Sequence, residues 1–131
     1  GIDALFDFTS AAEAIAGDVE YRCLYLRNAN ATDTMLSAVA WIAAQTPLAG
    51  SVLAIGLGSS AINGTEQTVA NESTAPAGVT FSEPASFGAG LAIGDIPAGQ
   101  HKAIWLRRTI TAASSSSPND TWQLGYQCET A

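Results

Sequence analysis

The sequence predicts an all-β protein, built as an antiparallel β-sandwich of roughly seven to eight short strands. Short apolar runs rich in β-branched and aromatic residues recur along the chain, and clusters of Gly, Pro, Asn and Asp separate them. No internal repeat of about 20 to 50 residues is present, which argues against solenoid and propeller folds. The pattern fits either an immunoglobulin-like or a jelly-roll sandwich, and it does not decide the strand order.

The region 91–110 carries the clearest pattern of strand, turn and strand. The apolar run that starts at Leu91 ends before Pro97 and Gly99, which favour a turn because proline presets φ and glycine tolerates positive φ. Residues 101–110 then place large apolar side chains on both faces of a strand. A strand with one solvent-exposed face would show a regular alternation of apolar and polar residues. We therefore expect 101–110 to be a central strand that is covered on both sides.

The remaining strands are expected at five further places. They are predicted over residues 20–28, 35–43, 51–57, 79–82 and 122–128. The last one alternates between large side chains and Gln or Gly, so we expect it to have one inward face. The residues of that inward face are Trp122, Leu124, Tyr126 and Cys128.

A long polar connection is expected over residues 58–78. Asn63-Gly64 within it predicts a tight turn, and 68–70 predicts a short edge strand. The Ser-rich stretch 112–120 predicts a flexible surface loop.

The chain suits one folded domain over residues 20–131, preceded by an N-terminal segment over 1–19. We expect this segment to act as an arm that contacts neighbouring molecules. Ser10 and Glu13 have the spacing of a capping box, which predicts a short helical turn within the arm.

Composition narrows the class of partner. Only 13% of the residues are charged, against roughly 25% in ordinary soluble domains. So little charge is typical of a protein whose surface is largely covered by neighbours, as in a shell or a filament. The formal net charge of −7, with five Lys and Arg, disfavours nucleic acid as a partner. No apolar run approaches the roughly 20 residues of a membrane span, so we expect no membrane partner.

Gly56-Leu-Gly58-Ser-Ser-Ala61 matches the glycine spacing of a dinucleotide-binding turn directly after a predicted strand. That site needs a helix at once, because the helix N-terminus holds the pyrophosphate. Asn63-Gly64 interrupts the chain within a few residues. The motif therefore favours a glycine loop at the end of a strand, and no cofactor is expected.

The residues that could support catalysis are few. His101 is the only histidine, and no multi-His or Cys-x-x-Cys metal spacing occurs. At the start of a strand it favours a hydrogen bond to a turn. No serine lies in a nucleophile elbow, and the carboxylates are scattered over loops, which leaves only a calcium site built from loop oxygens as a minor alternative. We expect no enzyme and no metal. Cys23 and Cys128 fit either a disulfide or two buried thiols.

Aromatic and arginine side chains supply the candidate interface. The aromatic residues lie within strong strands, which favours core and intersubunit packing over a sugar-binding platform. The adjacent Arg107 and Arg108 fall on opposite faces of one strand, and at least one is expected to pair with an acidic group at an interface. The candidate interface residues are Tyr21, Tyr25, Trp41, Trp105, Arg107 and Arg108.

Several stretches carry a resemblance to a known group of proteins. They are Leu5-Phe-Asp with Glu13-Ala, then Gly17-Asp-Val-Glu-Tyr-Arg-Cys-Leu-Tyr-Leu-Arg-Asn28, then Leu36, Val39 and Trp41-Ile42, and finally Ile96-Pro-Ala-Gly-Gln-His-Lys-Ala-Ile-Trp-Leu-Arg-Arg108. Over nearly the whole domain, the chain resembles virion proteins of tailed bacteriophages and prophages.

The resemblance implies a β-sandwich capsid decoration or cement protein on the exterior of the virion, assembled in the cytoplasm of the bacterial host. Its implied partners are the major capsid protein and further copies of itself, as a homo-oligomer. It brings no catalytic residues. The alternative is a sandwich module of a phage tail, fibre or baseplate, which could also bind glycans.

Overall fold

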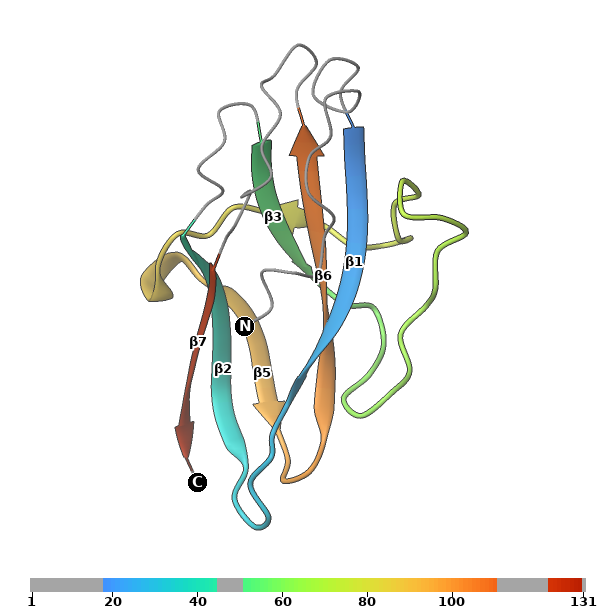
Figure 1. Ribbon diagram of the computed structural model, residues 1–131. Coiled ribbons are helices and arrows are strands. Elements are labelled where there is room, and N and C mark those ends of the chain that lie inside the picture. Colours follow the sequence, from blue (N-terminus) through green and yellow to red (C-terminus); the bar gives the residue numbers. More distant parts are fainter. Residues whose placement is uncertain (1–17, 45–50, 111–122, 131) are drawn as a thin grey trace.

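The computed structural model describes residues 18–44, 51–110 and 123–130, which form seven strands and one short 3₁₀ helix (Figure 1). The elements are β1 (Asp18–Arg27), β2 (Met35–Ala44), β3 (Ser51–Leu57), β4 (Phe81–Ser82), η1 (Phe87–Ala89), β5 (Leu91–Ile96), β6 (His101–Ile110) and β7 (Gln123–Thr130). The expected helical turn at Ser10, the loop over 112–120 and all but the last two residues of the arm over 1–19 lie outside the described residues.

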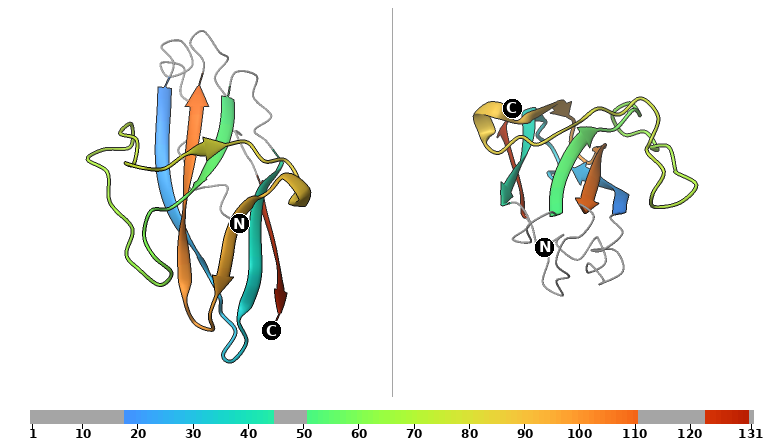
Figure 2. Two further views of the ribbon diagram at one scale, coloured as in Figure 1. Left: turned by 180° about the vertical axis from the view of Figure 1, so that it is seen from behind. Right: turned by 90° about the horizontal axis from the view of Figure 1, so that it is seen from above.

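Two antiparallel sheets form the molecule, and Figures 1 and 2 show them as two layers. The first sheet has the strand order β1-β6-β3-β4, and the second has the order β5-β2-β7. The predicted all-β, sandwich-like fold is therefore confirmed.

Strand pairing distinguishes the two sandwich types. β1 pairs with β6, β2 with β5 and β3 with β4, so the pairs are nested one inside another along the chain. Nested pairing is what one long antiparallel hairpin gives when it is wound into two sheets, as in a jelly roll. In the immunoglobulin order the first two strands are neighbours in one sheet, whereas β1 and β2 lie in different sheets. The order is that of a jelly roll with β7 added beside β2.

The hydrophobic core lies between the sheets and follows the two-residue period of the strands. Each fully buried Leu or Ile side chain contributes about 1.5 to 3 kcal/mol to stability. The core side chains are Leu53, Ile55, Ile104 and Leu106 from the first sheet, and Ala38, Ala40, Ile42, Ile93 and Ile96 from the second.

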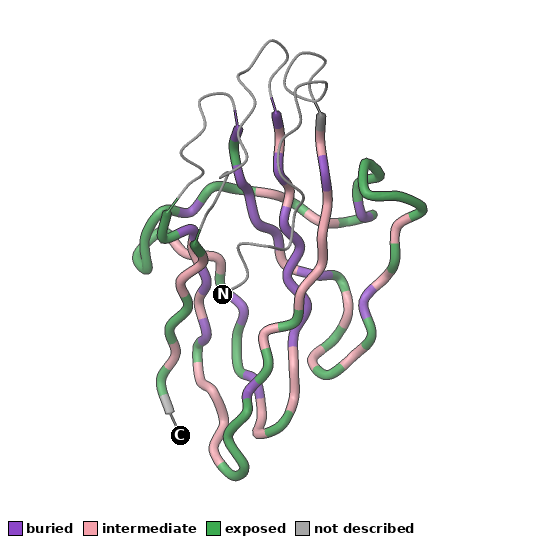
Figure 3. Tube along the Cα trace, viewed as in Figure 1, coloured by how far each residue is buried: buried purple, intermediate pink, exposed green. Residues whose placement is uncertain are grey.

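β6 is the central strand of the first sheet, paired with β1 on one side and β3 on the other. Every residue from Lys102 to Leu106 is buried, and Figure 3 shows β3 and β6 as the most continuously buried strands. Because successive side chains point to opposite faces, both faces must be covered. The expectation of a central strand covered on both sides is confirmed.

β7 departs from its predicted inward face. Leu124 and Cys128 pack against the core, but Tyr126 between them is 60% exposed. β7 is the edge strand of the second sheet, so an inward-pointing side chain there reaches past the sandwich into water. The predicted inward face is therefore confirmed for Leu124 and Cys128, whereas Tyr126 is largely exposed and Trp122 lies outside the described residues.

The connection after β3 holds no strand at 68–70, so that prediction is also wrong. The side-chain amide of Gln67 bonds both backbone groups of Ala77, at 2.7 and 3.0 Å, and this closes the segment without strand pairing. The predicted turn is present, because the Gly64 N–H donates to the carbonyl of Ala61 at 2.9 Å and Asn63 has φ of +63°.

Arg107 and Arg108 serve opposite faces of β6, as expected. Arg108 is buried and donates to the carboxylate of Glu20 in β1 at 2.6 Å. Its acidic partner therefore comes from the same chain and not from an interface. Arg107 points to the outer face, where its guanidinium carbon lies 5.0 Å from the ring centre of Phe81.

The Glu20–Arg108 pair generates a prediction about stability. Glu20→Gln removes one charge of a buried ion pair and should lower the free energy of unfolding by about 3 to 5 kcal/mol. Urea unfolding followed by circular dichroism measures this change. The double variant Glu20→Leu/Arg108→Met is the control and should lose less, because it leaves neither charge buried. A loss below about 1 kcal/mol for Glu20→Gln would contradict the assignment.

Candidate functional site

Residues 58–80 form the strap, the long connection between β3 and β4, which packs on the outer face of the first sheet. The N–H groups of Gly58 and Asn63 donate to backbone carbonyls of β6 at 2.9 and 2.7 Å. Further along, the N–H of Tyr21 in β1 donates to the carbonyl of Glu72 at 2.6 Å. Figures 1 and 2 show the strap running out beside β1 and returning across the sheet to β4. The strap is thus the outer cover of β6.

The two glycines of the apparent dinucleotide motif make room for the strap. A Cβ atom at Gly56 would lie 2.6 Å from the carbonyl oxygen of Thr80, and one at Gly58 would lie 2.6 Å from Cβ of Ala103 and 2.7 Å from Oε2 of Glu66. No side chain fits at either position. No helix follows β3 within residues 58–80, so the interpretation as a glycine loop at the end of a strand is confirmed.

Glu66 anchors the strap through a buried carboxylate that is 5% exposed. It accepts hydrogen bonds from the backbone N–H groups of Ser59 and Ser60, each at 2.7 Å, and from the Ser59 hydroxyl at 3.0 Å. A fourth bond comes from the indole N–H of Trp105 in β6, at 2.7 Å. The carboxylate thereby joins the beginning of the strap to the central strand.

These bonds decide the ionisation of Glu66. Burial raises the pKa of the carboxyl, but the bonds from Trp105, Ser59 and Ser60 together outweigh burial and lower the pKa from 4.5 to about 2. The carboxylate is therefore charged at neutral pH. For the thiol of Cys23, burial first and then the negative charge of Glu66 raise the pKa to about 11. That thiol stays protonated and unreactive at neutral pH.

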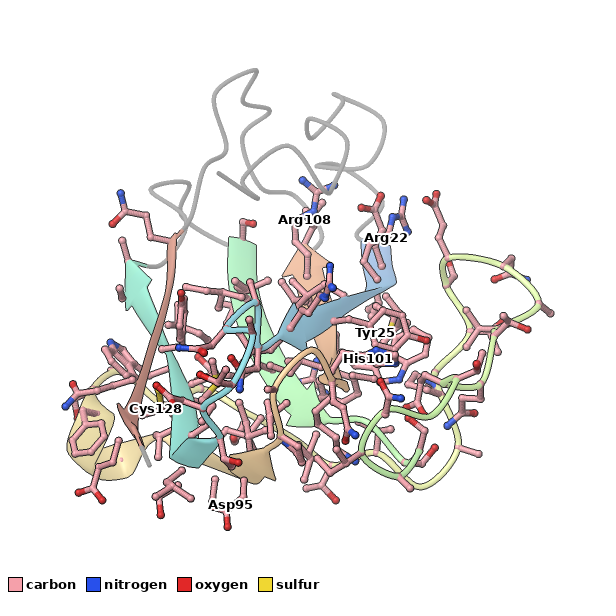
Figure 4. The ribbon with its side chains drawn as sticks, turned by 90° about the horizontal axis from the view of Figure 1, so that it is seen from below. Arg22, Tyr25, Asp95, His101, Arg108 and Cys128 are labelled. Atoms are coloured by element: carbon pink, nitrogen blue, oxygen red, sulfur yellow. The ribbon has the colours of Figure 1, made fainter. Side chains whose placement is uncertain are left out.

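Tyr25 and His101 extend the anchor toward the surface, and Figure 4 shows them side by side. The Tyr25 hydroxyl accepts a hydrogen bond from the backbone N–H of Glu66 at 2.9 Å. Its ring lies edge-on to the ring of His101, with 4.6 Å between the centroids. Nε2 of His101 lies 2.8 Å from the carbonyl oxygen of Gly64, so that nitrogen is the donor. The predicted hydrogen bond from His101 to a turn is present.

The structure divides the six candidate interface residues among three places. Tyr21, Tyr25, Trp105 and Arg107 are brought together on the outer face of the first sheet. Trp41 lies on the second sheet, and Arg108 points toward Glu20. Trp105 and Arg108 are buried within the chain, whereas Tyr25 is 44% exposed.

The two cysteines lie in different sheets, Cys23 in β1 and Cys128 in β7, and both are free thiols. Figure 4 shows Cys128 far from the cluster around Tyr25 and His101. Of the two alternatives left open by the sequence, the thiols are correct, although each is only partly buried.

An aromatic corner lies on the outside of the second sheet. The indole of Trp41 packs on the backbone of Gly125 in β7, where a Cβ atom would lie 2.5 Å from the ring carbon Cε2. Phe87 of η1 meets Trp41 edge-on, with 6.0 Å between the ring centroids, and is 49% exposed. Gln127 of β7 pairs with Val39 next to this corner and is exposed.

Sequence reasoning missed the roles of Glu66 and Phe87 and the exposure of Tyr126. Glu66 was indistinguishable from a solvated loop carboxylate, because its donors come from β6 and from the start of the strap. Phe87 lies in a stretch without strand periodicity, and the exposure of Tyr126 depends on where β7 lies in its sheet. The spacing of Gly56 and Gly58 was the only local signal that another segment packs closely here.

Residues 18–44, 51–110 and 123–130 contain no cluster of three or more His, Cys, Asp or Glu side chains arranged to hold a metal ion. The same residues contain no helix with the length and hydrophobicity needed to cross a bilayer. No protein family model, curated protein or solved structure matches the chain.

Glu66 generates a prediction about acid stability. Its folded pKa of about 2 lies below the ordinary value of 4.5, so its contribution to stability is complete above pH 4.5 and is lost as the pH falls toward 2. Glu66→Gln should lower the free energy of unfolding at pH 7 by about 3 kcal/mol and flatten its decline in acid. Urea unfolding at a series of pH values measures both effects.

The matched control is Glu72→Gln, which changes an exposed carboxylate of the same strap that pairs with Arg22. We expect this variant to cost less than about 1 kcal/mol, because exposed ion pairs contribute little. Equal losses from both variants would remove Glu66 from its role as the anchor.

Proposed function

We propose that this protein is a non-enzymatic structural component of a phage virion, a decoration or cement protein that binds and stabilises the outside of the capsid. The observation that carries the proposal is the exposure of large aromatic side chains on a chain of which only 13% is charged. They are Tyr25, Phe87 and Tyr126. Burial of such side chains against neighbouring molecules is favourable, because each removes a large apolar area from water.

The use of the reactive side chains also supports a structural role. Glu66 accepts four hydrogen bonds inside the fold, and His101 is bonded to the strap. The ammonium group of Lys102 donates to the carbonyl of Ser60 at the start of the strap. Each of these groups forms a hydrogen bond that holds the strap on the sheet, as expected for a protein with a structural role.

The proposed mechanism is attachment of the sandwich to the shell through its exposed aromatic side chains. Tyr25 on the first sheet and the Trp41–Phe87 corner on the second offer apolar contact surface on two sides of the molecule. A molecule with contact surfaces on two sides can bridge neighbouring capsid subunits. Such bridges would resist the internal pressure of a filled head.

Localisation in intact particles tests the proposal. Cryo-electron microscopy of virions that contain this chain should show its density on the capsid lattice. Heads that lack the chain should bind the purified protein, and the temperature at which they rupture should then rise. Density on the tail alone, or no binding to such heads, would refute the decoration role.

A tail, fibre or baseplate module is the second candidate, and the Trp41–Phe87 corner favours it. Aromatic faces stack on sugar rings, and the neighbouring amide of Gln127 suits hydroxyl groups. A glycan array separates the two functions: the decoration protein should show no specific sugar binding. Binding that Phe87→Ala abolishes, and that the control Val52→Ala on the other sheet leaves intact, would move the function to the tail.

A further inference from the structure

The two sheets of the described residues end in four edge strands, and three of these edges are protected. β1 is covered where Tyr21 bonds the strap. β4 has only two residues. β5 is irregular, because Gly94 has φ of +97° and β5 has one extra residue between Gly94 and Ala92 in its pairing with β2. Short, covered or bulged edges are the usual means by which β-proteins prevent strand addition.

β7 is the unprotected edge. It runs over the eight residues Gln123–Thr130 and contains no Lys, Arg or Pro. Its pairing with β2 runs from Gln123 to Thr130. The pairing contains two register shifts, and in both the extra residue belongs to β2 and not to β7. Within residues 18–44, 51–110 and 123–130, β2 is the only strand that pairs with β7, so the other side of β7 has no strand partner. Such an edge is a template for another strand.

The side chain that stands on this edge is apolar and exposed. Tyr126 is 60% exposed, the largest exposed fraction among the large hydrophobic residues of the described chain. It lies near the middle of β7, so a strand added to the edge would cover it.

The sequence of β7 is complementary to itself in antiparallel pairing about Tyr126. Tyr126 would face its own copy, which is a favourable aromatic pair. Leu124 would face Cys128 of the second copy, and both are apolar. Gln123 would face Glu129 of the second copy, so no two like charges lie opposite each other.

We infer that two copies of this chain associate through their β7 strands about a two-fold axis at Tyr126. The two three-stranded sheets β5-β2-β7 then join into one continuous sheet. The inference deepens the proposed function, on which it rests for the expectation of self-assembly, by assigning the self-contact to one strand. Association through β7 leaves the Trp41–Phe87 corner and Tyr25 available to contact the capsid.

Charge exchange at position 126 tests the inference in solution. Light scattering after size exclusion should give the mass of two chains for the wild-type protein. Tyr126→Lys and Tyr126→Glu should each give the mass of one chain, because like charges then face each other across the axis. An equimolar mixture of the two variants should restore the two-chain mass. Val52→Lys, an exposed apolar position on the other sheet, is the control and should leave the two-chain mass unchanged.

A single-chain mass for the wild-type protein, an unchanged mass for Tyr126→Lys, or no recovery in the mixture would overturn the inference. Hydrogen exchange of the wild-type protein gives a second readout that needs no substitution: amide protection over 123–130 should rise with protein concentration. Neither measurement involves capsids. A dimer that fails to bind heads would sink the decoration role alone, and a monomer that binds them would sink the β7 contact alone.

Discussion

The buried carboxylate of Glu66 is the interaction on which the outer half of the molecule depends. A charge inside a protein is costly unless hydrogen bonds replace its water, and four donors do so here. Because those donors come from both the strap and Trp105, the carboxylate fixes the strap to the central strand. Tyr25 and His101 extend this attachment to the surface. Without it, the outer face of β6 would meet water.

The strap and the nested strand pairing together bury the first sheet of this weakly charged chain on both of its faces. The core fills the space between the sheets, and the strap adds a hydrogen-bonded layer outside β6. The close approach of that layer depends on Gly56 and Gly58, where a side chain would collide with it. Large aromatic groups remain at the margins of the sandwich and along β7, which is where an assembling protein can meet its neighbours.

Local pattern was sufficient for much of the fold. The boundaries of β3 and β6 were predicted as they stand, since apolar runs bounded by turn residues leave the chain little choice. The burial of both faces of β6 followed from its two-sided apolar sequence. The division of Arg107 and Arg108 between opposite faces followed from the period of a strand. These properties depend on residues that are close together in the sequence, so they can be predicted from the amino-acid sequence alone.

By itself, then, the sequence determined an all-β sandwich, most of its strand positions and the opposite directions of neighbouring side chains. Only the tertiary structure decided the jelly-roll order, the anchoring role of Glu66, the separation of Cys23 from Cys128 and the exposure of Tyr126. The physical reason is distance along the chain. Trp105 lies 39 residues from the carboxylate that it bonds, and β7 is an edge because, among the described strands, only β2 pairs with it. Contacts between residues this far apart produce no local sequence pattern from which they could be predicted.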